Sequence, residues 1–411
     1  MKIIVAHPGQ QHSYKVASAL KSNGLLFKYI TAIYDQPDNV AMRLAHKIVR
    51  GNDSNKIGKR FNPDLRNDEV ITFYTFFSLV VIVLSRFKFT KKFSFWLDRR
   101  IADAFGIKVA KYAIRNKVDA VVCFSMNEVT CFKYLKKKAP NIRRIVDYAN
   151  TPVEHMVSIY EKDTCSELIK KEVPLFWNKA EAIKQKAGIN NTEIFIAPSS
   201  FVAKGLIECG VSERKISIIP YGTNFDVIPK KKISDNKVIR FIYVGQVTFR
   251  KGVHHLLEAF VMINSRNISL DIVGEILPNS KIYLQYKDLN NVKFWGNVSH
   301  EKVRELMLEA DVFLFPSLAD SFSLAVLEAM SCGLPVICSK FTGASDLIEQ
   351  GNCGEIVDPF EIEEFAEKIR GLEVNTDKRI IYSNNSIYTA TKYTWQFYSK
   401  NIGELFKRLE K

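Results

Sequence analysis

The sequence has no Cys-x-x-Cys pair and no hydrophobic run long enough to cross a membrane. Its seven cysteines are scattered, and their odd number argues against a disulfide framework and against a zinc site. The most apolar stretch, 71–84, has about 14 residues, whereas a spanning helix needs roughly 20. The chain opens on an apolar strand without the h-region of a signal peptide. We therefore expect a cytoplasmic protein in a reducing compartment.

The composition is that of a folded protein with a basic surface. Hydrophobic residues make up 47% and charged residues 25% of the 411 positions, which excludes a disordered chain and favours two domains. Lys and Arg number 59 against 44 Asp and Glu, giving a formal charge of +15. This surplus suits an anionic partner, which could be a nucleotide phosphate, a nucleic acid or an anionic membrane face. Charge alone does not choose among these partners.

Short β-rich runs alternate with helical patterns along the whole chain, which predicts a doubly wound α/β fold. Expected strands of the first half are 2–6, 27–31, 119–124, 144–148 and 194–197, with helical patterns at 13–22, 95–115 and about 152–187. The second half repeats the theme, with strands at 238–244, 268–273, 292–294, 311–315 and 335–339 and helices at 253–263, 300–309 and 324–331. We expect two Rossmann-like domains, with ligands at the carboxyl ends of their strands.

The domain boundary is expected in the polar stretch 223–236, which contains Pro229 and three consecutive lysines. The first domain would then cover residues 1–222 and bind the acceptor, and the second would cover residues 223–394. The segment 395–411 has apolar residues at helical spacing, so we expect it to pack back on the first domain. A cleft between two such domains is the default ligand site.

One strand-loop-helix segment combines an anion site with two carboxylates. A strand ends at Pro316, a polar loop follows, and a helix starts near Ser323 or Leu324, where free N–H groups could hold a diphosphate. Glu328 lies about one turn into this helix and could reach ribose hydroxyls, whereas Asp320 on the loop could accept hydrogen bonds from a sugar. The alternative is an ordinary turn with solvent-facing carboxylates.

A second strand-to-helix turn carries a basic pair, in the sequence VGQVTFRKG from Val244 to Gly252. Gly245 permits close approach of the backbone, and Arg250 and Lys251 supply cations for phosphate oxygens. The alternative is a surface Arg-Lys pair. Because the helix dipole disfavours cations at a helix start, an anionic ligand explains the pair better.

Three longer pieces carry a family resemblance: FIYVGQVTFRKGVHHLLEAF, NVKFWGNVSHEKVRELMLEADVFLFPSLADSFSLAVLEAMSCGLPVI and GASDLIEQGNCGEIVDP. The stretch APSSFVAKGLIECGVSERKISIIPYG precedes them, and HPGQQHSYKVASAL near the start is a looser match. Together these pieces resemble the family 4 retaining glycosyltransferases of the GT-B fold, also called glycosyltransferases group 1. The resemblance covers about half of the chain well. It implies an α/β protein of two Rossmann-like domains that face each other across a cleft.

The resemblance also implies a role for each matched position. Arg250 and Lys251 would neutralise the donor diphosphate, and Asp320 and Glu328 match the family's two Glu residues separated by seven positions. The catalytic residues would be Arg250, Lys251 and Asp320. The donor-binding residues would be Gly9, Gly245, Arg250, Lys251, Gly296, Asn297, Asp320, Ser321, Phe322, Ser323, Leu324 and Glu328.

The sequence departs from the family pattern at three places. Asp320 replaces the usual first Glu, and Gln246 stands where many members have an Arg. Many members also have a histidine after the strand that reads IVDYANTP here, at 145–152. Either His155 or His12 in the first loop would fill that place; the alternative for both is a surface or packing histidine.

The expected chemistry asks little of the side chains, because departure of a nucleoside diphosphate is stabilised by preorganised cations and amide dipoles. The resemblance implies retention of anomeric configuration without an obvious protein nucleophile. The sequence contains no Asp-x-Asp, and Arg250 with Lys251 could replace a divalent metal. We therefore expect no metal and no cofactor, with the nucleotide-sugar as a substrate.

The segment 69–96 is rich in aromatic and aliphatic residues and continues into Arg86, Lys88, Lys91 and Lys92. A strand followed by a buried helix is the simpler interpretation. The alternative is a peripheral membrane contact through 70–96, close to a lipid-linked acceptor and at the inner face of the membrane.

The leading hypothesis is an enzyme that transfers a hexose from a nucleotide-sugar to a glycan or lipid-linked acceptor in cell-surface polysaccharide synthesis. One alternative is a two-domain epimerase or phosphorylase that acts on the nucleotide-sugar itself. A nucleic-acid-binding protein is a further alternative, but the basic residues are dispersed and no nucleic-acid motif is present.

Overall fold

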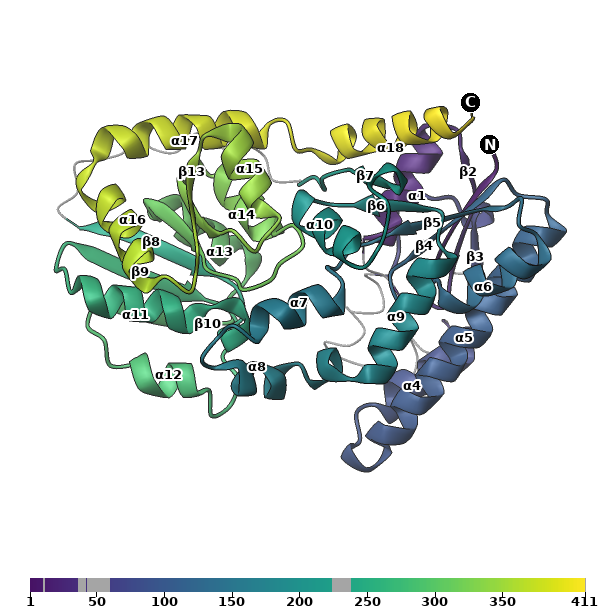
Figure 1. Ribbon diagram of the computed structural model, residues 1–411, viewed down its shortest axis with the longest axis horizontal. Coiled ribbons are helices and arrows are strands. Elements are labelled where there is room, and N and C mark those ends of the chain that lie inside the picture. Colours follow the sequence, from purple (N-terminus) through teal and green to yellow (C-terminus); the bar gives the residue numbers. More distant parts are fainter. Residues whose placement is uncertain (10–11, 36–41, 43–59, 224–237, 411) are drawn as a thin grey trace.

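The computed structural model of the protein describes residues 1–9, 12–35, 42, 60–223 and 238–410. These residues form two all-parallel sheets that lie side by side and are flanked by helices (Figure 1). The expected α/β class with two Rossmann-like domains is confirmed. Residues 224–237, which include the three consecutive lysines of the expected boundary, lie outside the described residues.

The first domain is built on a seven-stranded sheet of order β3-β2-β1-β4-β5-β6-β7. The strands are β1 (Ile3–His7), β2 (Leu26–Thr31), β3 (Val70–Thr72), β4 (Ala120–Phe124), β5 (Arg143–Asp147), β6 (Ile194–Ala197) and β7 (Ile216–Ile218). Its helices are α1 (Ser13–Ser22), α4 (Thr75–Leu84), α5 (Lys91–Arg115), α6 (Val129–Lys138), α7 (Val153–Tyr160), α8 (Ser166–Glu172), α9 (Lys179–Asn191) and α10 (Ser200–Glu208). The central strands β1 and β4 consist almost entirely of apolar residues, and all of their residues are buried. This pattern is expected when helices cover both faces of a parallel sheet.

The second domain is built on a six-stranded sheet of order β10-β9-β8-β11-β12-β13. The strands are β8 (Ile239–Val244), β9 (Ile268–Val273), β10 (Val292–Gly296), β11 (Val312–Phe315), β12 (Val336–Ser339) and β13 (Gly354–Val357). The helices are α11 (Val253–Ile263), α12 (Lys281–Tyr286), α13 (His300–Glu309), α14 (Leu324–Ser331), α15 (Ala344–Gly351), α16 (Ile362–Val374) and α17 (Thr376–Ala390). Because all strands are parallel, β8, β10 and β11 end at the same edge of the sheet.

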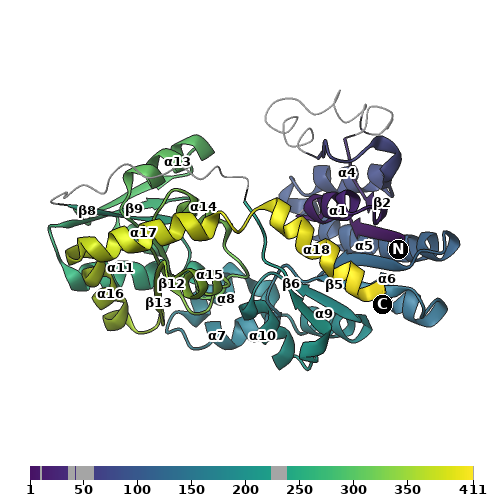
Figure 2. The same cartoon turned by 90° about the horizontal axis from the view of Figure 1, so that it is seen from above.

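The last helix, α18 (Trp395–Glu410), leaves the second domain and lies against α1 of the first (Figure 2). Its buried residues Tyr398, Ile402, Leu405 and Phe406 recur at helical spacing and form one apolar face. A Cβ atom at Gly403 would lie 2.1 Å from Asn23 Oδ1, so the two helices approach too closely for a larger residue.

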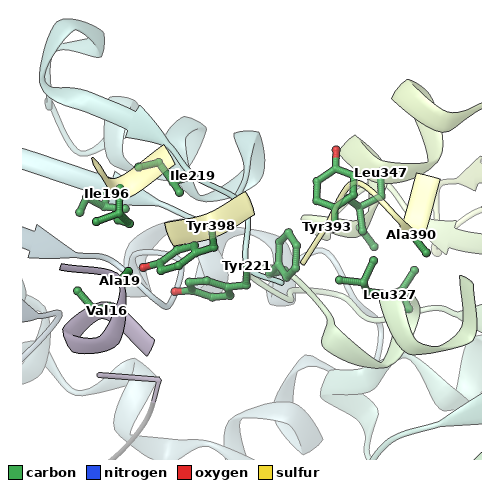
Figure 3. Packing of buried hydrophobic residues seen from close by; sticks show 14 of the residues in the cluster. Val16, Ala19, Ile196, Ile219, Tyr221, Leu327, Leu347, Ala390, Tyr393 and Tyr398 are labelled. Carbon is green, nitrogen blue, oxygen red and sulfur yellow. The ribbon is translucent and has the colours of Figure 1, made fainter. Parts of the chain in front are cut away.

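A buried aromatic group occupies the place where the chain crosses between the domains (Figure 3). Tyr221, after the last strand of the first domain, and Tyr398 of α18 both donate to the buried carboxylate of Asp147, at 3.1 and 3.2 Å. Asp147 ends β5, so one carboxylate ties the crossing segment and the last helix to the first sheet. Tyr393 and Leu347 continue the same cluster into the second domain.

The helical pattern expected over about 152–187 is confirmed, but the stretch is not one continuous helix. The structure divides it into α7, α8, a 3₁₀ turn at Pro174–Trp177 and α9. The break before α9 coincides with Pro174, which cannot donate the hydrogen bond of a helix interior and restricts Val173 before it. Residues of α7 and α8, which precede this break, pack against residues of the second domain (Figure 1).

The segment 69–96 forms β3, α4, a 3₁₀ turn at Lys88–Thr90 and the start of α5, and the expectation of a buried helix was wrong. Only Thr75 of α4 is buried, and Leu79 and Ile82 are partly buried against Ala32, Ile33 and Met42. The remaining large side chains form an exposed surface that we name the apolar patch: Phe76, Phe77, Val83, Phe87, Phe89, Phe93, Phe95 and Trp96. Among the described residues no helix is long and apolar enough to cross a bilayer.

Candidate active site

A cavity of about 640 Å³ lies between the two domains and is lined by loops that follow strands of both sheets. The second domain contributes Arg250 and Lys251 after β8 and residues 319–324 after β11. The first domain contributes 125–127 after β4, 149–151 after β5, and one face each of α5 and α9. This is the place at which open parallel sheets bind ligands.

The basic pair lies on a 3₁₀ turn, Phe249–Lys251, that ends at Gly252. Gly252 has φ +66°, and a Cβ atom there would lie 2.1 Å from the carbonyl oxygen of Pro316, so only glycine fits. The turn aims both cations at the cavity. Arg250 and Lys251 are half-buried, not exposed as a surface pair would be.

Lys251 is paired with Asp320 across the cavity wall, with Nζ 2.5 Å from Oδ2. Burial raises the pKa of Asp320, but the neighbouring Lys251 outweighs it and holds this pKa below its ordinary value. The other carboxylate oxygen, Oδ1, accepts a hydrogen bond of 2.7 Å from Ser323 Oγ. The carboxylate is therefore ionised and held in one orientation.

The loop that carries Asp320 is strained where it enters α14. Ser323 has φ +68°, a left-handed conformation that a residue with a side chain rarely adopts. No side chain caps the start of α14, and the N–H of Val326 donates to the carbonyl oxygen of Ser323 at 3.0 Å, so Leu324 and Ala325 carry the first-turn N–H groups that a ligand in the cavity would use. Strain of this kind is typical of functional sites.

The turn that carries the basic pair is also held from the first domain, by a residue that the sequence did not reveal. The carboxylate of Glu172, the last residue of α8, accepts hydrogen bonds from the backbone N–H groups of Phe249 and Arg250, at 2.9 and 3.0 Å. Burial raises the pKa of Glu172. No motif marks this position, because the contact depends on α8 reaching beneath the second domain.

The part of the cavity wall that the first domain contributes is polar where it meets the second domain. Thr151 N donates to Ser321 Oγ at 3.0 Å, and Ser199 Oγ donates to the carbonyl of Ser321 at 2.6 Å, so the loops of the two domains touch. Ala149 and Asn150 line the cavity where the family pattern has its histidine. The rule that ligands bind at strand carboxyl ends could have found them, since they directly follow β5.

Neither candidate histidine lines the cavity. His155 is buried on α7, pairs with Glu208 and packs its ring on Phe201. His12 precedes α1, with Nε2 3.0 Å from Asp147 Oδ1 and its ring on Tyr221. Tyr221 lines the cavity, so His12 lies one layer behind the wall, and the structure places His155 on the far side of α7.

The remaining expected residues divide into two groups. Asp320, Ser321, Phe322, Ser323 and Leu324 line the cavity. Gly9, Gly245, Gly296, Asn297 and Glu328 do not line it. Gly245 follows β8, Gly296 is the last residue of β10 and Asn297 follows it, so all three lie at the same sheet edge. Burial raises the pKa of Glu328 on α14. Gly9 follows β1 and donates to His7 Nδ1 at 2.8 Å, and its neighbours 10–11 lie outside the described residues.

The second half of the chain matches a known family of enzymes. Residues 224–388 match the family described as Glycosyl transferases group 1. The second domain is thus similar to group 1 glycosyl transferases. Over 199 residues the chain is 28% identical to the capsular polysaccharide biosynthesis glycosyltransferase CapM of Staphylococcus aureus, covering 44% of this chain and 52% of CapM. The chain spans about half the length of several curated relatives that it matches.

Solved structures extend the likeness from the second domain to the whole fold. Sucrose-phosphate synthase of Thermosynechococcus elongatus has 18% identity and a TM-score of 0.65, with 100% of this chain and 99% of that one covered. The Anabaena protein HepE, solved in complex with UDP, has 16% identity and a TM-score of 0.63, with 99% and 100% covered. The chain thus has the GT-B fold, with both Rossmann-like domains present.

Proposed function

We propose that the protein is a retaining glycosyltransferase that moves a sugar from a nucleotide-sugar donor to a lipid-linked or glycan acceptor. One observation carries the proposal: Arg250, Lys251 and Asp320 converge on one interdomain cavity, next to the uncapped start of α14. Cations and amide dipoles suit a diphosphate, and a fixed carboxylate suits sugar hydroxyls. The family match of residues 224–388 supports the same activity.

The donor would lie along the edge where β8, β10 and β11 end. Its diphosphate would contact Arg250, Lys251 and the first turn of α14, and Asp320 would orient the sugar. The nucleoside would extend toward Gly296, Asn297 and Glu328. When the bond between sugar and diphosphate breaks, negative charge grows on the leaving oxygen, and the preorganised cations stabilise it without reorganisation.

We propose that this chemistry needs no divalent metal and no cofactor. The two cations on the 3₁₀ turn would supply the charge that a metal would bring to the diphosphate. The carboxylate of Glu172 accepts hydrogen bonds from two backbone N–H groups of this turn and so holds it in place. The acceptor hydroxyl would approach from the side of the first domain. Retention of configuration remains part of the proposal and rests on the family resemblance.

The acceptor is proposed to be lipid-linked because the cavity opens beside the apolar patch. Phe95 belongs to the patch and also lines the cavity, together with Asp98 and Arg99 of the same helix. A group of eight exposed, large apolar side chains such as this patch is typical of an interaction site. The exposed Lys91, Lys92 and Arg100 adjoin it and suit anionic headgroups. A membrane-bound acceptor could enter the cavity along α5, and CapM, a relative in capsule synthesis, is consistent with this role.

An epimerase or phosphorylase of the same fold is the alternative. Such an enzyme would act on the nucleotide-sugar alone and would need no surface that binds an acceptor. The apolar patch beside the cavity therefore favours a glycosyltransferase over an epimerase or phosphorylase. Nucleic-acid binding gains no support, since several basic side chains are engaged in ion pairs with acidic neighbours.

Thermal unfolding with nucleoside diphosphates and nucleotide-sugars tests the donor site. Binding to the folded state raises the unfolding temperature in proportion to affinity and concentration. We expect at least one nucleoside diphosphate, with UDP as the first probe, to stabilise the protein, and its sugar conjugate to do so as well. If no nucleotide in a full set shifts the unfolding temperature, the proposed donor site is wrong.

A further inference from the structure

A buried cluster of metal-binding side chains lies where α7–α8 meets the second domain. Asp163 follows α7 and Cys165 precedes α8, whereas His254 begins α11 of the other domain. Their ligand atoms all lie within 4.8 Å of one another. None of the three lines the interdomain cavity, and the function proposed above uses none of them.

His254 and His255 lie at different distances from the carboxylate of Asp163. His255 Nε2 lies 2.8 Å from Asp163 Oδ2, the length of a hydrogen bond to a carboxylate. His254 Nε2 lies 3.2 and 3.4 Å from the two oxygens of the same carboxylate, a longer contact at the outer limit of a hydrogen bond. Ligands at about 2.0–2.2 Å from a tetrahedral metal ion lie roughly 3.2–3.6 Å apart. The separations between His254 Nε2 and the Asp163 oxygens are therefore also those of two ligands on one metal ion, and Cys165 supplies the third ligand atom within reach.

The surroundings have the features that support metal ligands. Asp163, His254 and His255 are each at least 94% buried, with exposed fractions of 3%, 3% and 6%. The N–H of Cys165 donates to Asp163 Oδ1 at 2.6 Å, and His255 holds the other oxygen, so the carboxylate is oriented by neighbours, as ligating carboxylates usually are. Cys165 is only partly buried and gives the cluster a route to solvent.

We propose that Asp163, Cys165 and His254 bind a zinc ion, with water as the fourth ligand. A donor set of one carboxylate, one thiolate and one imidazole suits Zn²⁺ and excludes Mg²⁺ and Ca²⁺, which prefer oxygen. On binding, the Cys165 thiol releases its proton to solvent and a metal-sulfur bond forms. The Asp-x-Cys spacing is invisible to a search for Cys-x-x-Cys, and the third ligand comes from the other domain.

Such an ion would connect the two domains behind the basic turn. The ring of Phe249 packs on His254, with centroids 4.9 Å apart, and Phe249 is the first residue of the turn that carries Arg250 and Lys251. The ion would therefore steady this turn while remaining outside the cavity. This role is structural, and it is compatible with a donor site that itself needs no metal.

Metal titration of the full chain tests the site without reference to activity. Chelator-treated protein is titrated with Zn²⁺ against a chromogenic chelator, and Co²⁺ is used to detect the charge-transfer absorption of a cobalt thiolate. We expect one ion per chain, a higher unfolding temperature with Zn²⁺, and thiolate absorption with Co²⁺. Cys165→Ser should lose the absorption and weaken zinc binding at least tenfold, the scale on which metal sites lose affinity when their supporting groups are removed.

The matched control is Cys209→Ser, because Cys209 is the other partly buried cysteine and lies outside the cluster. This variant should bind zinc and cobalt as the original chain does. Near-ultraviolet circular dichroism in chelator checks that Cys165→Ser is folded, and His254→Gln provides a second variant. Binding that is absent, or that is equal in the original chain, Cys165→Ser and His254→Gln, would overturn the proposal and leave only a buried His-Asp pair.

Discussion

Lys251 and Asp320 form an ion pair of 2.5 Å inside the interdomain cavity. The cation expected to bind phosphate and the carboxylate expected to bind sugar therefore neutralise each other before any ligand arrives. A donor must share Lys251 with Asp320, so the two residues cannot be treated as independent binding groups.

This pairing predicts that Asp320→Asn separates binding from turnover. The variant loses the charge that competes for Lys251, so nucleoside diphosphate should bind as well as before or more tightly. Turnover should fall by about 10²-fold, the usual cost of removing one preorganised polar group from the reacting centre. Calorimetric titration and steady-state kinetics on the same preparation give both numbers. Asp320→Glu, which restores the family residue, should retain much of the turnover; weakened binding with normal turnover would show that the roles are misassigned.

Arg250→Ala should weaken nucleoside diphosphate binding by about 1.5–3 kcal/mol, the net value of a hydrogen bond to a charged group. The side chain lines the cavity and is half-buried, with Nη2 3.4 Å from Gln246 Oε1, so folding should change little compared with nucleotide binding. The control is Arg266→Ala, since Arg266 is exposed outside the cavity lining. Equal affinity in the two variants would contradict the phosphate site.

Glu172→Ala should weaken donor binding although Glu172 does not line the cavity. Its carboxylate holds two backbone N–H groups of the basic turn, and their loss leaves the turn less ordered. We expect a KM for the donor raised by about tenfold, on the scale of one net hydrogen bond. Glu172→Gln keeps one acceptor oxygen and should recover part of the loss. Glu167→Ala on the exposed face of the same helix should have no effect, and an effect there would remove the specific role of Glu172.

The apolar patch predicts salt-sensitive association with anionic membranes. The original chain should sediment with phosphatidylglycerol vesicles at low ionic strength and be released by salt, because the charges of Lys91 and Lys92 are screened. Phe77→Ser with Phe89→Ser should reduce binding by removing two of its exposed rings. Ile381→Ser removes an exposed apolar side chain of α17 and serves as the control. Vesicle binding that is unchanged in the double variant would mean that the patch is not the contact.

Glu128 predicts a pH dependence of stability. This residue is buried where α6 begins, and burial raises its pKa to about 7. The folded state then binds more protons than the unfolded state between pH 4.5 and 7, so stability falls as pH rises through that window. Glu128→Gln removes the effect and should stabilise the protein at pH 8 by about 3 kcal/mol, but hardly at pH 4.5. Urea unfolding at both pH values measures this; a gain equal at both would point to packing instead.

Regular elements of the second half were predictable because hydrophobic period and turn residues agree there. The helices at 253–263, 300–309 and 324–331 begin and end where the pattern predicts. The first half contains the wrong expectation, a buried helix at 71–84, and the breaks that divide the helical stretch at 152–187 were not predicted. Periodicity identifies an apolar face but not what covers it, so it could not show that α4 is left exposed or that α7 and α8 reach the other domain.

The candidate site likewise contains residues that the sequence predicts and residues that only the fold brings together. Arg250, Lys251 and the loop 320–324 stand in local motifs, so sequence alone brings them together at one sheet edge. Glu172 and the partners of Asp163 come from distant segments that meet only in the folded chain. The pairing of Lys251 with Asp320 also joins residues 69 positions apart, and no spacing rule anticipates it.

Transfer of a labelled sugar from a nucleotide-sugar to membrane lipid extract tests the central claim most directly. The measurement follows the label and the released nucleotide in the same reaction, with the slower variant Asp320→Asn as the control. Sugar transfer predicts that label enters the lipid or glycan fraction and that one nucleoside diphosphate appears for each sugar moved. Release of sugar 1-phosphate, an epimerised donor formed without acceptor, or no consumption of any nucleotide-sugar that binds would contradict it.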